Sequence, residues 1–216
     1  MSWPFAFQDL LREFITLFVV IDPVGTIPVF LFATAAVPQR LHRSFALRAV
    51  LVSALVLGLF LVLGQIILEG IGLRLGAFQI AGGIILFLFA LSMIFGETKA
   101  ASEIKEAETE DLSGAVFPLA IPSIASPGAI LAVVILTDNH STGIVEQTMT
   151  AVVLLFVLVI TFLLLLLASK IQKLIGQTGV SVISRVMGLI LATVAVDSVL
   201  QGLEQMGVLA LSNAPI

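Results

Sequence analysis

Six apolar runs, each about 20 residues long, set the main limit on what this chain of 216 residues can fold into. As an α-helix, a run of that length crosses the roughly 30 Å hydrocarbon core of a bilayer. The runs cover residues 13–36, 46–68, 75–95, 114–136, 147–168 and 186–208. Only 11% of the residues are charged and the mean hydropathy is +1.20, whereas soluble domains are about 25% charged. The sequence therefore predicts an all-α polytopic membrane protein with six transmembrane helices.

The longest hydrophilic stretch, residues 97–113, lies halfway along the chain. We expect it to be a cytoplasmic linker between two three-span repeats, residues 1–96 and 114–216. The loops after the first, third and fifth spans hold eight of the ten Lys and Arg residues. Because cationic residues concentrate in cytoplasmic loops, both termini are predicted to be periplasmic or extracellular. The N-terminus lacks the features of a cleavable signal, so the first span is expected to be retained.

The two halves of the chain repeat a pattern of residues. The first span contains DPVG from Asp22, and the fourth contains SPG from Ser126, about 104 positions later. The third and sixth spans align at almost the same offset, with Gly83 matching Gly188. Since each half has three spans, an odd number, the halves must be inverted relative to each other. Inverted repeats whose matching helices are interrupted are typical of secondary transporters with a midplane site.

Both interruptions are predicted to start a new half-helix inside the membrane. Asp and Ser favour the N-cap and Pro favours the first helical position. The free amides at such starts attract an anion such as a carboxylate. Asp22 and the carbonyls that end the upstream half-helices would receive an ammonium, so a small zwitterion satisfies both. The predicted substrate-binding residues are Asp22, Pro23, Gly25, Thr26 and Pro28 in the first half, and Pro122, Ser123, Ser126, Pro127 and Gly128 in the second.

Several of these positions have a second interpretation. Asp22 either contacts substrate and takes part in coupling, or only caps a kinked helix. Asp197 either carries a coupling proton or hydrogen-bonds Ser92 or Gln201 as a structural residue. Glycines at matched places either pack helices closely or frame a small cavity. These glycines are Gly82, Gly83 and Gly188. Pro118, Pro122 and Pro28 are expected to loosen the half-helices that contain them.

Composition also excludes whole classes of function. The chain has no cysteine, which removes disulfides, thiolate metal sites and cysteine nucleophiles. Its Lys and Arg residues are scattered and form no basic face for nucleic acid. We expect no metal site, no cofactor and no enzymatic activity. The partners expected instead are the lipid bilayer, a small zwitterionic amino acid and a coupling proton or sodium ion.

Three stretches together resemble one known family. DPVGTIPVF from Asp22, PLAIPSIASPGAI from Pro118 and GGIILFLFALSMIFG from Gly82 are similar to motifs of the MarC-type family, also called the small neutral amino acid transporter family and grouped with lysine exporters. The resemblance covers essentially the whole chain. It implies an inner-membrane transporter of glycine, alanine and similar amino acids, coupled to a proton or ion gradient, with substrate held between the interrupted spans. Where many members of the family have Gly, this chain has Ser126, which would narrow the site or add a hydroxyl contact.

Two other classes compete with amino acid transport. One is an exporter of another small solute or a drug, although a cation transporter would be expected to carry more than two acids within its membrane spans. The other is an intramembrane aspartyl enzyme that pairs Asp22 with Asp197. The sequence context disfavours this enzyme, because the repeat aligns Asp22 with Ser126 and Asp197 with Ser92. Neither acid is therefore paired with the other.

Overall fold

The structure is a computed structural model that describes residues 7–35, 37–95, 112–137 and 143–209. All regular structure within these ranges is helical, which confirms the predicted all-α fold. The elements are α1 (Phe7–Ile21), α2 (Thr26–Ala33), η1 (Gln39–Leu41), α3 (His42–Gly70), α4 (Leu75–Phe95), η2 (Leu112–Ala115), η3 (Val116–Ile124), α6 (Pro127–Leu136), α7 (Ile144–Leu166) and α8 (Ala168–Gln205). Of the predicted linker 97–113, all but the last two residues lie outside the described ranges.

Four described helical segments are long and apolar enough to cross a membrane alone: the stretch from η1 through α3, then α4, α7 and residues Ser181–Gln205 of α8. Two further spans are possible if each of two bent helix pairs counts as one. The α1 and α2 axes bend by 42°, and those of η3 and α6 bend by 47°. The predicted first and fourth spans are therefore the ones that are interrupted.

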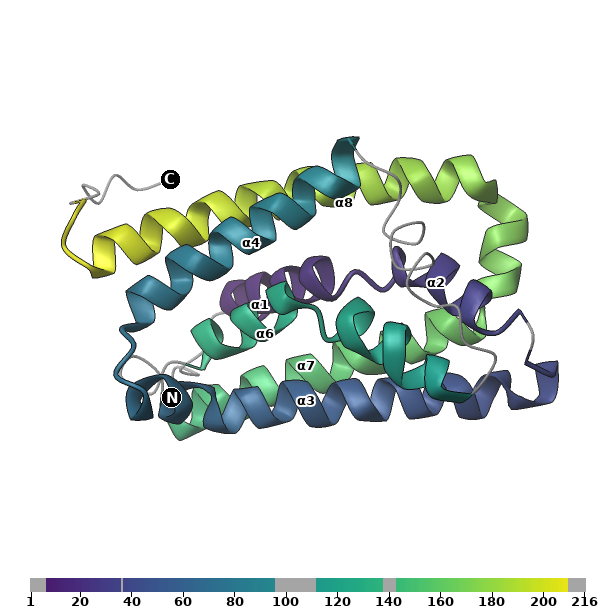
Figure 1. Cartoon of the computed structure of the whole chain (residues 1–216), viewed down its shortest axis with the longest axis horizontal. Coiled ribbons are helices and arrows are strands. Elements are labelled where there is room, and N and C mark those ends of the chain that lie inside the picture. Colours follow the sequence, from purple (N-terminus) through teal and green to yellow (C-terminus); the bar gives the residue numbers. More distant parts are fainter. Residues whose placement is uncertain (1–6, 36, 96–111, 138–142, 210–216) are drawn as a thin grey trace.

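Helix α8 begins earlier than the predicted sixth span. It starts at Ala168 and is broken once, at Gly176, whose φ of +65° lies in the left-handed region that glycine adopts readily. The segment before this break turns the chain from the end of α7 toward the membrane-spanning part of α8 (Figure 1).

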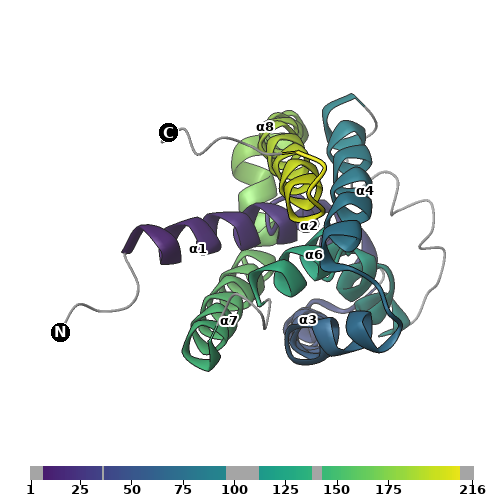
Figure 2. The ribbon, with the colours of Figure 1, turned by 90° about the vertical axis from the view of Figure 1, so that its left-hand side faces the viewer.

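Helices at matching places in the two halves run in opposite directions. In Figure 1, α3 and α7 lie side by side and antiparallel, as do α4 and α8, with the bent pairs between these two layers. Figure 2 shows the same layers end-on. The start of α1, the α3–α4 connection and the ends of α6 and α8 gather at one end of the molecule. The inverted repeat itself stays a prediction, and these directions agree with it.

Glycines at matching positions of α4 and α8 make matching close contacts between these two helices. A Cβ atom added to Gly83 would lie 2.9 Å from the carbonyl oxygen of Ala195. One added to Gly188 would lie 3.1 Å from the carbonyl oxygen of Ala90. Ala90 and Ala195 are separated by the same number of positions as Gly83 and Gly188. Each glycine thus lets the partner backbone approach at a matching place on the other helix.

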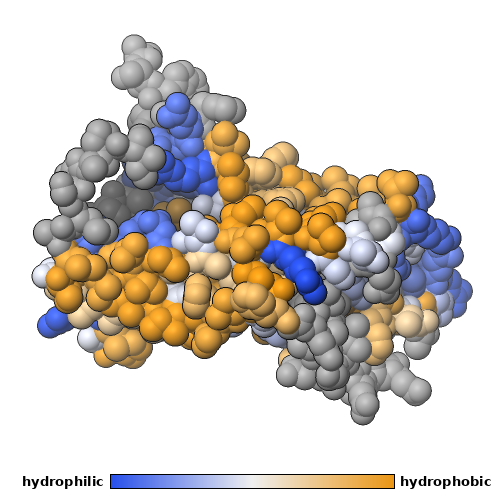
Figure 3. All heavy atoms as spheres, turned by 90° about the horizontal axis from the view of Figure 1, so that it is seen from above, coloured by the Kyte–Doolittle hydropathy of each residue, from blue (hydrophilic) through white to orange (hydrophobic). Residues whose placement is uncertain are grey.

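The outer faces of the helices are apolar and exposed, as expected for contact with lipid. Leu55 of α3 is 70% exposed and Leu88 of α4 is 61% exposed. Seen from the α4 and α8 side, hydrophobic residues dominate the middle of the molecule and hydrophilic residues gather toward its ends (Figure 3). The interior is held by aromatic and aliphatic contacts between the bent pairs and the long helices, such as Phe30 of α2 with Phe45 of α3, two buried residues whose ring centroids are 6.2 Å apart.

Candidate functional site

The break in the fourth span has the geometry that the sequence predicts. Ser126 is extended, with φ −70° and ψ 158°, and Pro127 is the first residue of α6. The Ser126 hydroxyl accepts a hydrogen bond from the Ala129 amide at 3.1 Å, which satisfies one amide that a helix start leaves without a partner. Ser126 therefore caps α6, and Pro127 fits there because its missing N–H is not needed.

The break in the first span differs from its prediction. Helix α2 begins at Thr26, not at Pro23, and Asp22 has a φ of +50°, in the left-handed region. Asp and Asn tolerate this region better than most residues. The Asp22 carboxylate nevertheless accepts a hydrogen bond from the Gly25 amide at 3.0 Å, at the same three-residue spacing as Ser126 and Ala129. The backbone carbonyl of Asp22 accepts from the Thr26 amide at 3.1 Å, which joins the turn to α2.

The prolines divide between two effects. Phe117 and Ile121, which precede Pro118 and Pro122, have non-helical backbone angles, so η3 is irregular as expected. The buried carbonyl of Ala120 accepts hydrogen bonds from the Ala125 amide at 2.8 Å and from the Ser53 hydroxyl of α3 at 3.2 Å. For Pro28 the prediction was wrong, because α2 continues through this residue as a regular helix. Pro28 lies in the first turn of α2, where a proline removes no required hydrogen bond.

The two breaks lie against each other in the interior. The Ser123 hydroxyl donates to the Thr26 hydroxyl across 3.3 Å, and the Ser126 hydroxyl donates to the Val20 carbonyl across 3.3 Å. Asp22 and Ser126 are each 2% exposed, and Thr26 and Ser123 are fully buried. Polar residues that the sequence places about 100 positions apart thus form one buried cluster between α1, α2, η3 and α6. We call Asp22, Thr26, Ser123 and Ser126 the break cluster.

The glycines of the site lie in tight packing. A Cβ atom at Gly128 would overlap the Leu86 side chain of α4, and one at Gly82 would overlap Leu131 of α6. A Cβ atom at Gly25 would overlap the Asp22 carboxylate. In the described structure these glycines make room for neighbouring side chains, which favours the packing interpretation of Gly82 and Gly128.

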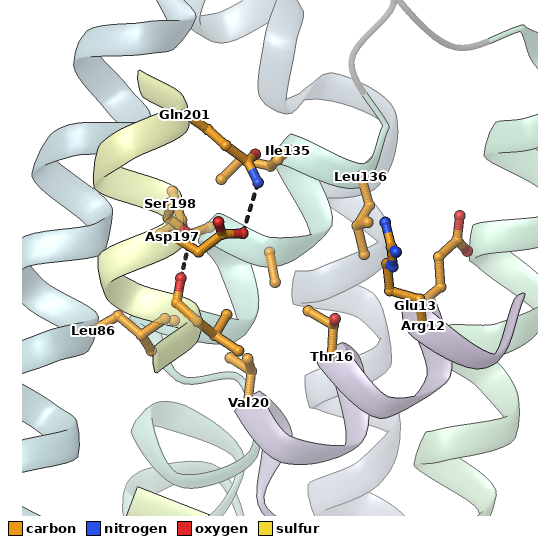
Figure 4. Close-up of a pocket in the computed structure, with 14 residues that line it drawn as sticks. Arg12, Glu13, Thr16, Val20, Leu86, Ile135, Leu136, Asp197, Ser198 and Gln201 are labelled. Atoms are coloured by element: carbon orange, nitrogen blue, oxygen red, sulfur yellow. Dashed lines mark hydrogen bonds between the residues drawn. The ribbon is translucent and has the colours of Figure 1, made fainter. Parts of the chain in front are cut away.

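A cavity of about 500 Å³ leads from one end of the molecule toward the break cluster. It lies between α1, α4, α6 and α8 (Figure 4). Its inner part includes Val20, Leu86 and Gly128, and Val20 is the residue whose carbonyl binds Ser126. Its polar lining residues are Arg12, Glu13, Thr16, Asp197, Ser198 and Gln201. We call this space the terminal cavity, because its polar residues come from the first and last helices.

Two acids of the terminal cavity have defined partners. Asp197 accepts a hydrogen bond from the Gln201 side-chain amide at 2.7 Å, so Gln201 rather than Ser92 is its neighbour. The Ser92 hydroxyl donates to the Phe89 carbonyl instead. The Glu13 carboxylate accepts from the Thr150 hydroxyl of α7 at 3.2 Å. Asp197 is exposed to the cavity, whereas Asp22 is buried in the break cluster, so the two acids occupy different environments.

The sequence pointed to Asp197 and its neighbour Gln201, but not to the other polar residues of the lining, which are Arg12, Glu13, Thr16 and Ser198. Arg12 counts in the sequence only as one of the two cationic residues on the side opposite the cytoplasm. One signal was available: Arg12 and Thr16 are four residues apart, as are Asp197 and Gln201, so each pair shares one face of its helix. That these two faces meet across a cavity depends on tertiary packing.

Comparison with known proteins places nearly all of the described region in one family. Residues 7–207 match the family described as MarC family integral membrane protein. The chain is 34% identical to a UPF0056 membrane protein of Methanocaldococcus jannaschii, over 91% of this chain and 97% of the relative. It is 34% identical to the UPF0056 membrane protein YvbG of Bacillus subtilis, over 93% and 96%. It is 31% identical to the UPF0056 inner membrane protein YhgN of Escherichia coli, over 91% and 97%. No solved structure matches the chain.

Proposed function

The chain belongs to the MarC family of integral membrane proteins, and on that basis we propose that it is a secondary transporter of small neutral amino acids such as glycine and alanine. It moves them across the cell inner membrane by alternating access, coupled to a proton or sodium gradient. The observation that carries the proposal is the pair of helix breaks that meet in the interior at the inner part of a polar cavity.

The hydrogen bonds at the breaks suggest how a zwitterion binds. In the described structure the Gly25 and Ala129 amides are taken by the side chains of Asp22 and Ser126. A substrate carboxylate competes for the Gly25 amide, because an anion is favoured at this positive end of α2. The displaced Asp22 carboxylate is then available to accept the substrate ammonium. When the substrate replaces Asp22 at the Gly25 amide, its carboxylate binds this amide and its ammonium binds the released Asp22 carboxylate.

The tight packing around the breaks favours a small substrate. Thr26 and Ser123 are fully buried, and the space beside Gly25 is filled by Asp22. A hydrogen or a methyl group as substrate side chain needs the least rearrangement here, since interiors packed this closely accommodate added volume poorly. Glycine and alanine are the amino acids that meet this condition.

Opposite helix directions in the two halves support alternating access. Transporters built from inverted repeats change access largely by moving one repeat or bundle against the other around a fixed site. The antiparallel α4–α8 and α3–α7 pairs, with the bent helices between them, have the arrangement that such a motion requires (Figure 1). The break cluster then remains near the middle while the cavity opens at alternate ends.

Uptake into proteoliposomes tests the proposal directly. Purified protein is expected to accumulate labelled alanine when a proton or sodium gradient is imposed, and to equilibrate it without a gradient. Empty liposomes provide the background. Absence of alanine and glycine uptake under every gradient, together with uptake of a different solute, would replace amino acid transport with the rival export function.

The enzymatic alternative receives no support from the described contacts. An aspartyl enzyme needs two carboxylates that share a proton. Asp22 binds the Gly25 amide inside the break cluster, while Asp197 binds Gln201 in the terminal cavity. We therefore propose no catalytic role for either acid.

A further inference from the structure

The terminal cavity carries charges of opposite sign on two different helices. Arg12 comes from α1, and Asp197 comes from α8 (Figure 4). Glu13, the other acid of the lining, lies on the far side of Arg12 from Asp197 in this view and binds Thr150 of α7. The cavity between α1 and α8 is therefore bordered by a cation on one helix and an anion on the other.

Both charged groups have capacity to bind a ligand. Among the described residues, the Arg12 side chain makes no ion pair and no hydrogen bond. A guanidinium binds a carboxylate through two parallel hydrogen bonds, which is a strong and directional contact. Asp197 accepts one hydrogen bond from Gln201, whereas a carboxylate offers about four acceptor positions. An ammonium group with three donors can use the positions that remain.

The inner part of the cavity is apolar and closely packed. Val20 is fully buried and Leu86 is 3% exposed, and the absent side chain of Gly128 leaves space that Leu86 fills. A ligand held by its charges near the mouth would direct only a short side chain toward these residues. Beyond Val20 lies Ser126 of the break cluster, so the cavity is the approach to the site already described.

We propose that the terminal cavity is a separate outer binding site for small zwitterionic amino acids, with the carboxylate at Arg12 and the ammonium at Asp197. The choice of amino acids rests on the proposed function, whereas the requirement for two opposite charges rests on the cavity itself. Its volume of about 500 Å³ exceeds that of alanine, so water accompanies the ligand and bridges part of the distance. Asp197 is then a substrate ligand rather than a residue needed only for coupling.

Ligands that lack one charge separate the two contacts. Binding of alanine, alaninamide and propionate to purified protein is measured by calorimetry for the wild type and for Arg12→Gln and Asp197→Asn. Arg12→Gln is expected to weaken alanine and propionate about tenfold or more and to leave alaninamide unchanged, because a hydrogen-bonded charge contact is lost. Asp197→Asn is expected to weaken alanine and alaninamide and to leave propionate unchanged.

Matched controls use charges outside the cavity. Arg74→Gln removes a cation near the same end of the molecule, and Glu204→Gln removes an acid from α8; neither residue lines the cavity. Both variants are expected to bind alanine like the wild type. Arg12→Lys is expected to recover part of the alanine affinity, and unfolding temperatures identify any variant that fails to fold.

The outcomes distinguish this proposal from the proposed function. Alanine binding that is equal in wild type, Arg12→Gln and Asp197→Asn, but lost in Asp22→Asn, overturns the outer site and leaves transport through the break cluster in place. A wild-type protein that neither binds nor transports alanine or glycine overturns both. A loss that is the same for all three ligands in a variant also contradicts the assignment of one charge to each residue.

Discussion

At the scale of single residues, Asp22 combines a structural and a chemical property that one substitution separates. Asn at this position keeps an oxygen that can accept the Gly25 amide but removes the negative charge. If the charge binds substrate, Asp22→Asn loses at least about tenfold in alanine uptake while its unfolding temperature stays near that of the wild type. Asp22→Ala loses uptake and also about 1 kcal/mol of stability, because the amide loses its partner. Full uptake by Asp22→Asn would leave Asp22 with only the structural role of binding the Gly25 amide in the turn before α2.

Gly25 allows a second prediction at this scale, which concerns stability. Its φ of −66° is one that alanine adopts without strain, so the backbone does not require glycine. The requirement is spatial, since a Cβ atom would overlap the Asp22 carboxylate. Gly25→Ala is expected to displace Asp22 and lower the free energy of unfolding by about 1–3 kcal/mol.

The control for this change is Gly58→Ala in α3, where an added Cβ atom would have no neighbour within 4 Å. An alanine inside a helix is favoured over glycine by about 0.5–1 kcal/mol, so this variant is expected to be at least as stable as the wild type. Thermal unfolding in detergent compares the two. Equal unfolding temperatures for the two variants would show that Asp22 does not occupy the space beside Gly25.

At the scale of helices, the antiparallel register of α4 and α8 makes a prediction that the cysteine-free chain is well suited to test. A Cβ atom at Gly83 would lie 2.7 Å from a methyl group of Val199, and one at Gly188 would lie 3.0 Å from the Cβ atom of Met93. The double variants Gly83→Cys with Val199→Cys, and Gly188→Cys with Met93→Cys, are both expected to cross-link on oxidation. Both contacts are closer than the roughly 3.5–4.5 Å between the Cβ atoms of a disulfide, so a small separation of the two helices brings each pair into range. The measurement is a change in electrophoretic mobility that reductant reverses.

A pair that combines Gly58→Cys of α3 with Val199→Cys serves as the negative control, because nothing lies near the Gly58 position. Cross-linking of only one of the two α4–α8 pairs would mean that the helices diverge toward one end. Gly83 and Gly188 would then not approach the partner backbone equally closely. Their contacts would no longer agree with the predicted inverted repeat.

Local chemistry explains which helix boundaries the sequence predicted. Ser126 and Pro127 have the same preferences in any helix start, so α6 begins where expected. Asp22 has equally strong local signals, yet its left-handed backbone and the position of α2 depend on how its carboxylate folds over Gly25. The terminal cavity could not be predicted, because Arg12 and Asp197 are brought together only when α1 packs near α8. Predictions from sequence were therefore accurate at the Ser126–Pro127 helix start, but equally local signals at Asp22 placed the start of α2 three residues too early.

At the scale of the whole molecule, the side to which the terminal cavity opens follows from the topology. The cavity includes the early residues of α1 and the late residues of α6 and α8, which lie at the same end as the α3–α4 connection. The distribution of Lys and Arg predicts that this end is periplasmic or extracellular. We therefore expect Leu73→Cys, at the exposed α3–α4 connection, to react with a membrane-impermeant maleimide in intact cells. Gln39→Cys, exposed at the opposite end, is expected to react only after permeabilisation. The reverse pattern would place the terminal cavity on the cytoplasmic side, and the outer site would then receive amino acids for export.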